Sequence, residues 1–224
     1  MENVNLILAI LSNLAIVSSA AFAVIQYLKQ RRLTRVSNAI EIAKHFANEM
    51  VDLCGLVVAV MYGDSEIKNI IEKHKGEIEN VTLFNKIECK RIFSDREMEK
   101  YNAFIDRAII IGEKGNVKLG NVMQDVLNQL EHCGISFNSG IADEMAVYQS
   151  LHQTIFLLMP CTYPWIASIN DSVIDKYYTN FCSLYVRWNR IKKKAIKKSE
   201  KAKRRAEKYN SQYNKIGQIK PTKV

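Results

Sequence analysis

The strongest chemical signal in the sequence is a run of closely spaced lysines and arginines near the C-terminus. Residues 184–224 hold 15 Lys and Arg but only two Glu, whereas the whole chain of 224 residues has 32 Lys and Arg against 23 Asp and Glu. Cations at this density attract phosphate groups, either of anionic lipid or of nucleic acid. The candidate polyanion-binding residues are Arg187, Arg190, Lys192, Lys193, Lys194, Lys197, Lys198, Lys201, Lys203, Arg204 and Arg205. A tail that only solubilises the chain and sets its orientation is the alternative.

The cysteines and histidines do not have the spacing of a metal site. The five cysteines are scattered along the chain at Cys54, Cys89, Cys133, Cys161 and Cys182. The four histidines are His45, His74, His132 and His152. The ligands of zinc sites usually occur at C-x-x-C or H-x-x-x-H spacing, and this sequence contains neither pattern. We therefore expect no metal or other cofactor, and buried, reduced thiols, with Cys133 beside His132 as the candidate for a redox-sensitive one.

The sequence lacks the motifs of common catalytic sites. It contains no phosphate-binding loop of the form G-x-x-x-x-G-K-[ST], no dinucleotide-binding glycine pattern after a strand, and no G-x-S-x-G elbow. The acidic pair Asp143-Glu144 lies at the start of an expected helix, where it complements the positive end of the helix dipole. We therefore expect a protein that is not an enzyme. A site assembled from residues remote in sequence is the alternative.

The N-terminal part of the chain has the length and composition of a membrane helix. The 23 residues from Leu6 to Leu28 carry no charge, and four basic residues follow between positions 29 and 35. At about 1.5 Å per residue this run spans roughly 35 Å, enough to cross a hydrocarbon core of about 30 Å. Basic residues beside a span tend to stay cytoplasmic. We therefore expect a single-pass protein of the bacterial inner membrane, with its N-terminus outside and its body in the cytoplasm.

A cleaved secretory signal is the alternative interpretation of the same run. Ala21-Phe22-Ala23 has the small-x-small form of a cleavage site. The segment Met1 to Asn5, however, carries only the acidic Glu2 where a signal normally begins with basic residues, and apolar residues continue beyond the site. These features favour a retained anchor over residues 1–32.

Small residues form a ridge along one face of the expected span. Ala15, Ser19 and Ala23 recur at every fourth position, and Asn13 lies near them. Small residues let two helix backbones approach closely, and an asparagine can hydrogen-bond across such a pair. We therefore expect a homo-oligomer formed through this ridge. The alternative is that small residues are simply common in membrane helices.

The remaining sequence predicts a helical body. With only 9 Gly and 3 Pro the chain lacks the turn residues of an all-β fold. Apolar periodicity predicts helices at about 34–62, 65–75, 82–92, 94–111, 117–133, 140–159 and from 172 onward. The capping box Ser94-Asp95-Arg96-Glu97 starts one of these helices, and Pro160 is expected to end another. The apolar stretch 155–169 is expected to be a kinked core helix, with a second membrane span as the alternative.

Together these patterns predict an all-α fold in three parts. The expected parts are a single transmembrane helix over 1–32, a multi-helix cytosolic bundle over 33–190, and a basic tail over 191–224 that is helical or disordered. The anchor implies the lipid bilayer as a partner, and the tail implies anionic lipid or nucleic acid. A protein partner is expected but not identified by any motif.

Several short motifs between residues 126 and 188 resemble a bacterial family. These are the run Leu127-Asn128-Gln129-Leu130-Glu131, then Gly140 and Asp143, then Tyr185-Val186-Arg187-Trp188. The family is a domain of unknown function, found in small proteins with one N-terminal membrane helix and an all-helical cytosolic part. The resemblance implies this architecture but no reaction, substrate or catalytic residue.

Asn128 and Glu131 lie three positions apart and share a helix face. We expect them to lock two helices together through buried hydrogen bonds, with a ligand site as the alternative.

The function expected from these features is that of a membrane-anchored scaffold or effector. The sharper hypothesis is the membrane effector of a bacterial anti-phage or stress system, in which self-associating spans perturb the membrane. The alternatives are a membrane tether for nucleic acid or a ribonucleoprotein through the basic tail, and an enzyme whose site is not visible in the sequence.

Overall fold

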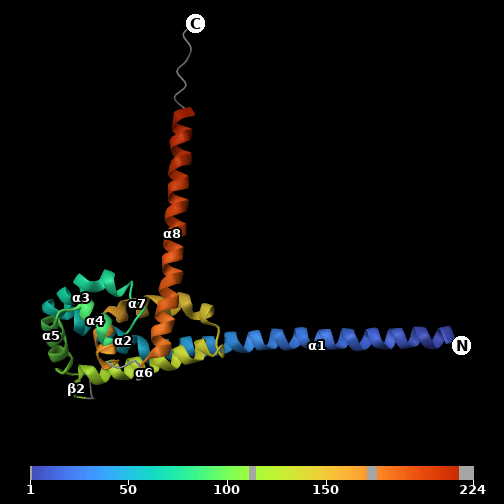
Figure 1. Ribbon diagram of the computed structural model, residues 1–224, viewed down its shortest axis with the longest axis horizontal. Coiled ribbons are helices and arrows are strands. Elements are labelled where there is room, and N and C mark those ends of the chain that lie inside the picture. Colours follow the sequence, from blue (N-terminus) through green and yellow to red (C-terminus); the bar gives the residue numbers. More distant parts are fainter. Residues whose placement is uncertain (1, 111–114, 171–175, 217–224) are drawn as a thin grey trace, which may run out of the picture.

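Two long helices extend from a body of shorter helices. The computed structural model describes residues 2–110, 115–170 and 176–216, without the side chains of 2–12 and 209–216. Helix α1 (Glu2–His45) and helix α8 (Thr179–Ile216) both project from the body (Figure 1). The body contains the π-helical turn η1 (Phe46–Met50), α2 (Val51–Gly63), α3 (Ser65–Ile78), α4 (Lys86–Ile92), α5 (Asp95–Ile105), α6 (Leu119–Asn138) and α7 (Glu144–Ile169). The predicted, mostly helical fold with one long apolar N-terminal helix is confirmed.

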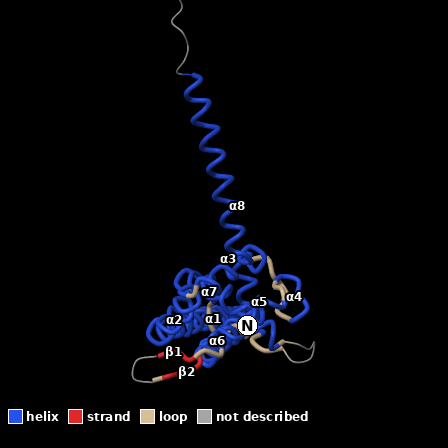
Figure 2. The backbone as a smooth tube through the Cα atoms, turned by 90° about the vertical axis from the view of Figure 1, so that its left-hand side faces the viewer, coloured by secondary structure: helices blue, strands red, loops and turns tan. Residues whose placement is uncertain are grey.

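The two projecting helices point in different directions. In Figure 1, α8 runs across the direction of α1. In the view turned by 90° (Figure 2), the N-terminus of α1 faces the viewer while α8 again runs across the line of sight. The two views together show that α8 extends sideways relative to α1.

Helix α1 carries the chain from the apolar run into the body without interruption. Only past His45 does the helix change to the turn η1, and α2 follows directly. The buried residues of this stretch repeat at helical spacing and include Ala39, Phe46, Met50 and Val57. The helix predicted for 34–62 is therefore divided among α1, η1 and α2. Its predicted apolar stripe is buried only in part, since Ile40 and Ala47 are exposed.

The prediction that Pro160 ends a helix is wrong, because α7 continues through both Pro160 and Pro164. A proline lacks the N–H that would bond one turn back, so a helix interior tolerates it only where other groups satisfy the backbone. Both prolines are themselves buried, and nearby the buried hydroxyl of Tyr101, in α5, donates to the backbone carbonyl of Cys161. Packing of α7 in the core, which sequence periodicity does not show, therefore accompanies the passage of the helix through both prolines.

The stretch 155–169 is a core segment of α7. Among its side chains, Leu158, Tyr163 and Ile166 are fully buried. Among the residues whose side chains are described, one helical stretch, Asn13–Gly63, is long and apolar enough to cross a membrane. The expected core position of 155–169 is therefore observed, and the part of the chain with described side chains offers no support for a second span.

A small β-hairpin replaces the end of one predicted helix. Helix α5 begins after Ser94 with the predicted capping box but ends at Ile105 rather than near residue 111. Strand β1 (Ala108–Ile110) then pairs antiparallel with β2 (Asn116–Lys118), with Ala108 opposite Lys118. The predicted helix stop at 111–112 lies outside the described residues. The fold is therefore mostly helical, as predicted, and the described part of the chain adds one short two-stranded sheet.

Candidate functional site

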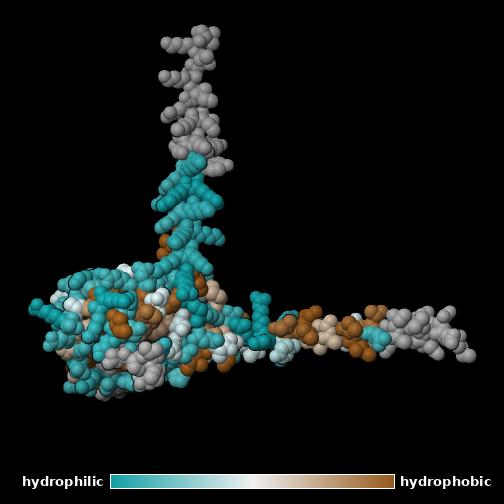
Figure 3. Space-filling model, viewed as in Figure 1, coloured by the Kyte–Doolittle hydropathy of each residue, from teal (hydrophilic) through white to brown (hydrophobic). Residues whose placement is uncertain are grey.

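The outer part of α1 exposes a continuous apolar surface. Every described side chain from 13 to 34 is exposed, including large residues such as Ile16 (64%), Val17 (66%) and Phe22 (62%). Figure 3 shows this surface as a mainly brown helix beyond the body. Water-soluble monomers rarely expose apolar patches of this extent, so the surface is suited to a non-aqueous environment.

The predicted helix-packing residues all lie on this exposed part of α1. Asn13, Ala15, Ser19 and Ala23 are exposed. The Ser19 hydroxyl donates to the carbonyl of Ala15 at 2.7 Å, so its hydrogen-bonding capacity is partly used within the helix. The ridge of Ala15, Ser19 and Ala23 therefore presents small side chains on an open surface.

The predicted polyanion-binding residues divide into two groups. Arg187, Lys192 and Lys193 hold α8 to the body. The Arg187 guanidinium lies 3.0 Å from the Glu144 carboxylate, and the Lys193 ammonium donates to the carbonyl of Glu79 at 2.9 Å. The other eight are exposed, namely Arg190, Lys194, Lys197, Lys198, Lys201, Lys203, Arg204 and Arg205.

We call residues 194–205 of α8 the basic arm. Its side chains are exposed, and within the described part of the chain the ion pairs involve none of its cations. Figure 3 shows the arm as a hydrophilic rod standing away from the body. The arm is therefore an open cationic surface, whereas the three residues at its base serve the fold.

Glu131 of α6 caps the N-terminus of α8. Its carboxylate accepts from the backbone N–H of Asn180 at 3.1 Å, from the Asn180 side-chain amide at 2.7 Å, and from the backbone N–H of Phe181 at 2.8 Å. A carboxylate at this position satisfies amides that have no partner within the helix and complements its dipole. Asn128 is exposed on α6, and no hydrogen bond among the described residues joins its side chain to α8. Of the expected pair, only Glu131 therefore contacts α8.

Glu144, in the first turn of α7, binds α8 at a second point. Its Oε1 atom accepts from the indole N–H of the fully buried Trp188 at 2.7 Å, and its carboxylate pairs with Arg187. Sequence reasoning assigned Glu144 only to the dipole of its own helix, because no local pattern shows that residue 188 lies beside it. The two contacts together fix the direction in which the arm leaves the body.

The five cysteines are all buried, as expected. For the candidate redox-sensitive thiol, burial raises the pKa of Cys133 to about 11. Its thiolate, the reactive form, is therefore scarce at neutral pH. His132 beside it in sequence is exposed and does not share its environment.

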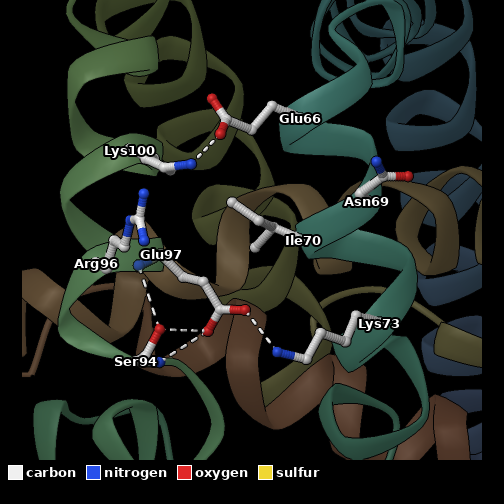
Figure 4. Close-up of a pocket in the computed structure, with 8 residues that line it drawn as sticks. All are labelled: Glu66, Asn69, Ile70, Lys73, Ser94, Arg96, Glu97 and Lys100. Carbon is white, nitrogen blue, oxygen red and sulfur yellow. Dashed lines mark hydrogen bonds and ion pairs between the residues drawn. The ribbon is translucent and has the colours of Figure 1, made fainter.

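A cleft of about 470 Å³ lies between α3 and α5. Figure 4 shows the residues that line it, Glu66, Asn69, Ile70, Lys73, Ser94, Arg96, Glu97 and Lys100. Lys73 donates to Glu97 at 2.8 Å, and Lys100 pairs with Glu66. These acids and bases neutralise each other, and the ion pairs that they form across the cleft connect α3 with α5.

The pKa of Glu97 predicts how this connection responds to acid. Burial raises it, but hydrogen bonds from Lys73, from the backbone and hydroxyl of Ser94 and from His74 outweigh this and lower the pKa from 4.5 to about 2. The stabilisation is complete above the unfolded-state pKa near 4.5 and is lost as pH falls toward 2. Because the Glu97 side chain is partly exposed to solvent, this stabilisation is limited to about 1–2 kcal/mol.

We expect Glu97→Gln to lower the free energy of unfolding by about 1–2 kcal/mol at pH 7, and by much less at pH 3. Urea unfolding of the full chain in detergent at the two pH values measures the difference. Glu99→Gln, at an exposed position of the same helix, is the matched control. A loss of equal size at both pH values would contradict the assigned role of Glu97.

Comparison with known proteins gives one match. Residues 13–188 match the model of a family described as a domain of unknown function, DUF4760. Neither the curated proteins nor the solved structures include a match to the chain. The predicted resemblance to a domain of unknown function is confirmed. The matched region includes Glu131, Glu144 and Trp188 and ends before the basic arm.

Proposed function

Since the chain belongs to the DUF4760 family, a domain of unknown function, we propose a role for it from its geometry alone. It is a single-span protein of the bacterial inner membrane, with the N-terminus outside and the body in the cytoplasm. It acts as a scaffold or effector rather than as an enzyme. The body holds the anchor α1 and the basic arm in a fixed relative direction.

The observation that carries this proposal is the exposed apolar surface of α1. Side chains such as Ile16, Val17 and Phe22 are exposed, although removal of apolar surface from water is favourable by about 25 cal/mol per Å². A bilayer removes this surface from water without any contact with the body. The basic residues Lys29, Arg31 and Arg32 directly follow the apolar run and favour a cytoplasmic body.

The direction of α8 favours anionic lipid as the partner of the arm. With α1 crossing the bilayer, a helix that extends sideways from α1 runs along the membrane plane (Figures 1 and 2). This direction holds the exposed cations from Lys194 to Arg205 parallel to the membrane surface along the length of the arm. Each basic residue close to an anionic membrane surface contributes about 1 kcal/mol of attraction.

Self-association through α1 is the proposed mode of action of an effector. The ridge of Ala15, Ser19 and Ala23 is exposed, which suits close contact between two spans. In the proposed anti-phage or stress response, assembled spans perturb the membrane. The test forces the chains to cluster in the membrane and measures the membrane potential. If the Ala15→Leu and Ser19→Leu variants, when clustered, perturb the potential as strongly as the unaltered chain does, this mode of action is contradicted.

The topology is tested by trypsin treatment of spheroplasts, because the arm is an exposed helix rich in Lys and Arg. We expect a C-terminal tag to stay attached to the chain in intact spheroplasts and to be released within minutes after lysis. A periplasmic protein of known trypsin sensitivity controls for protease access. Release of the tag from intact spheroplasts would place the body outside and contradict the proposed orientation.

A nucleic-acid tether is the second candidate function, favoured by the unpaired cations of the arm. In that case the purified protein carries nucleic acid, and its ratio of absorbance at 260 to 280 nm falls after a high-salt wash. A protein-like ratio already at low salt counts against the tether.

A further inference from the structure

A polar cavity lies where α1 meets the loop between α6 and α7. It has a volume of about 530 Å³, within the usual range of small-molecule sites. It is lined by Tyr27, Gln30, Arg31, Thr34, Arg35 and Asn38 of α1 and by Ser139, Gly140 and Ile141 of the loop. Two arginines thus contribute to one concave surface together with several uncharged polar residues.

The loop is fixed to α1, so the cavity is a built feature of the fold. The backbone N–H of Asp143 donates to the carbonyl of Arg35 at 3.0 Å, and the Asn38 side-chain amide donates to the carbonyl of Ile141 at 3.0 Å. Gly140, with a φ of 70°, provides the left-handed turn that this loop requires. These contacts position the loop beside the arginines.

Within the described residues, the positive charge of the cavity has no ion-pair partner. Among the described residues, the ion pairs include neither Arg31 nor Arg35, and the Nε atom of Arg35 is buried without a hydrogen-bond partner. The carboxylate of Asp143 caps α7 by accepting from the backbone of Met145 at 3.0 Å. Two guanidinium groups that line one concave surface without an ion pair among the described residues favour an external anion there.

The position of the cavity along α1 indicates the source of that anion. The apolar run ends at Leu28, and the cavity begins at Tyr27. Tyrosines concentrate at the membrane interface, where the headgroup phosphates lie. Ile141, whose carbonyl accepts from Asn38 at the other end of the cavity, is 55% exposed.

We propose that this cavity binds the phosphate-containing headgroup of an anionic phospholipid of the inner leaflet. The inference rests on the proposed membrane span of α1. Arg31 and Arg35 bind the phosphate, the uncharged polar residues contact the glycerol part of the headgroup, and Tyr27 contacts the start of the acyl chains. The site connects one lipid to α1 and, through the loop, to α6 and α7.

The test uses the full chain in a mild detergent, with bound lipid counted by native mass spectrometry during titration with phosphatidylglycerol. We expect one phosphatidylglycerol to bind in preference to phosphatidylcholine. The Arg31→Gln variant should bind it roughly tenfold more weakly, because a charge-assisted contact to the phosphate is lost. Arg32→Gln removes the same charge from an exposed neighbour outside the cavity lining and should bind as the unaltered chain does.

Three outcomes overturn the inference. Equal weakening in Arg31→Gln and Arg32→Gln would show diffuse attraction rather than a site, and no preference over phosphatidylcholine would show no headgroup recognition. Displacement of the lipid by millimolar glycerol phosphate would show a site for a soluble anion. If the chain needs detergent to stay in solution and gives any of these results, only the proposed lipid site is contradicted. A chain that stays monodisperse without detergent contradicts the proposed function itself.

Discussion

Replacement of Gly134 by alanine should destabilise the body by about 3 kcal/mol. An added Cβ atom would lie 2.7 Å from the carbonyl carbon of Asn180, 2.8 Å from the amide nitrogen of Phe181 and 2.9 Å from the carbonyl oxygen of Asn180. All three are backbone atoms of the first turn of α8 and cannot rotate away. The expected effect is therefore separation of α6 from α8, despite the preference of helices for alanine over glycine.

Gly55→Ala is the matched control for this prediction. Gly55 also lies inside a helix, α2, but an added Cβ atom there meets nothing within 4 Å. We expect this variant to be more stable by about 0.5–1 kcal/mol, through helix propensity alone. Urea unfolding of both variants, followed by circular dichroism, measures the two free energies. Gly134→Ala as stable as Gly55→Ala would contradict the close approach of α6 and α8.

Replacement of Glu131 by alanine should lower the free energy of unfolding by about 2–4 kcal/mol. The variant leaves three donors without their acceptor, namely both N–H groups from Asn180 and the backbone N–H of Phe181. It also removes the negative charge that complements the positive end of the α8 dipole. We expect the first turn of α8 to open more often and the arm to lose its fixed direction.

Hydrogen exchange of the amides at the start of α8 measures this opening directly. The protection of Asn180 and Phe181 should fall strongly in Glu131→Ala. Asn128→Ala, one turn earlier on α6 and at an exposed position, should change stability by no more than about 0.5 kcal/mol. If the Asn128 variant proves as destabilising as the Glu131 variant, the hydrogen bonds from α8 to Glu131 do not explain the loss of stability.

Local signals were sufficient to predict most of the helices. The start of α5 follows from the capping box of Ser94 and Glu97, in which each residue satisfies an amide of the other. The burial of Phe46, Met50 and Val57 follows from helical spacing. These features depend on residues within one or two turns of each other, so a single sequence shows them.

Features that depend on tertiary contacts could not be predicted. The passage of α7 through Pro160 and Pro164 occurs where both prolines are buried in the core, a setting that no local sequence pattern shows. The contact of Glu144 with Trp188 and the cap from Glu131 likewise join residues more than 40 positions apart. For the same reason, the sequence does not separate the three cations at the base of α8 from the arm, because their partners Glu144 and Glu79 are remote in sequence.

The central claim is that the apolar surface of α1 lies in a bilayer. Fractionation of cells that express the full chain, with an alkaline carbonate wash of the membranes, tests it most directly. We predict that the intact chain stays in the membrane pellet after the wash and enters solution only with detergent. Recovery of the full-length chain in the soluble fraction, or of a form trimmed after Ala23 in the periplasm, would contradict the claim.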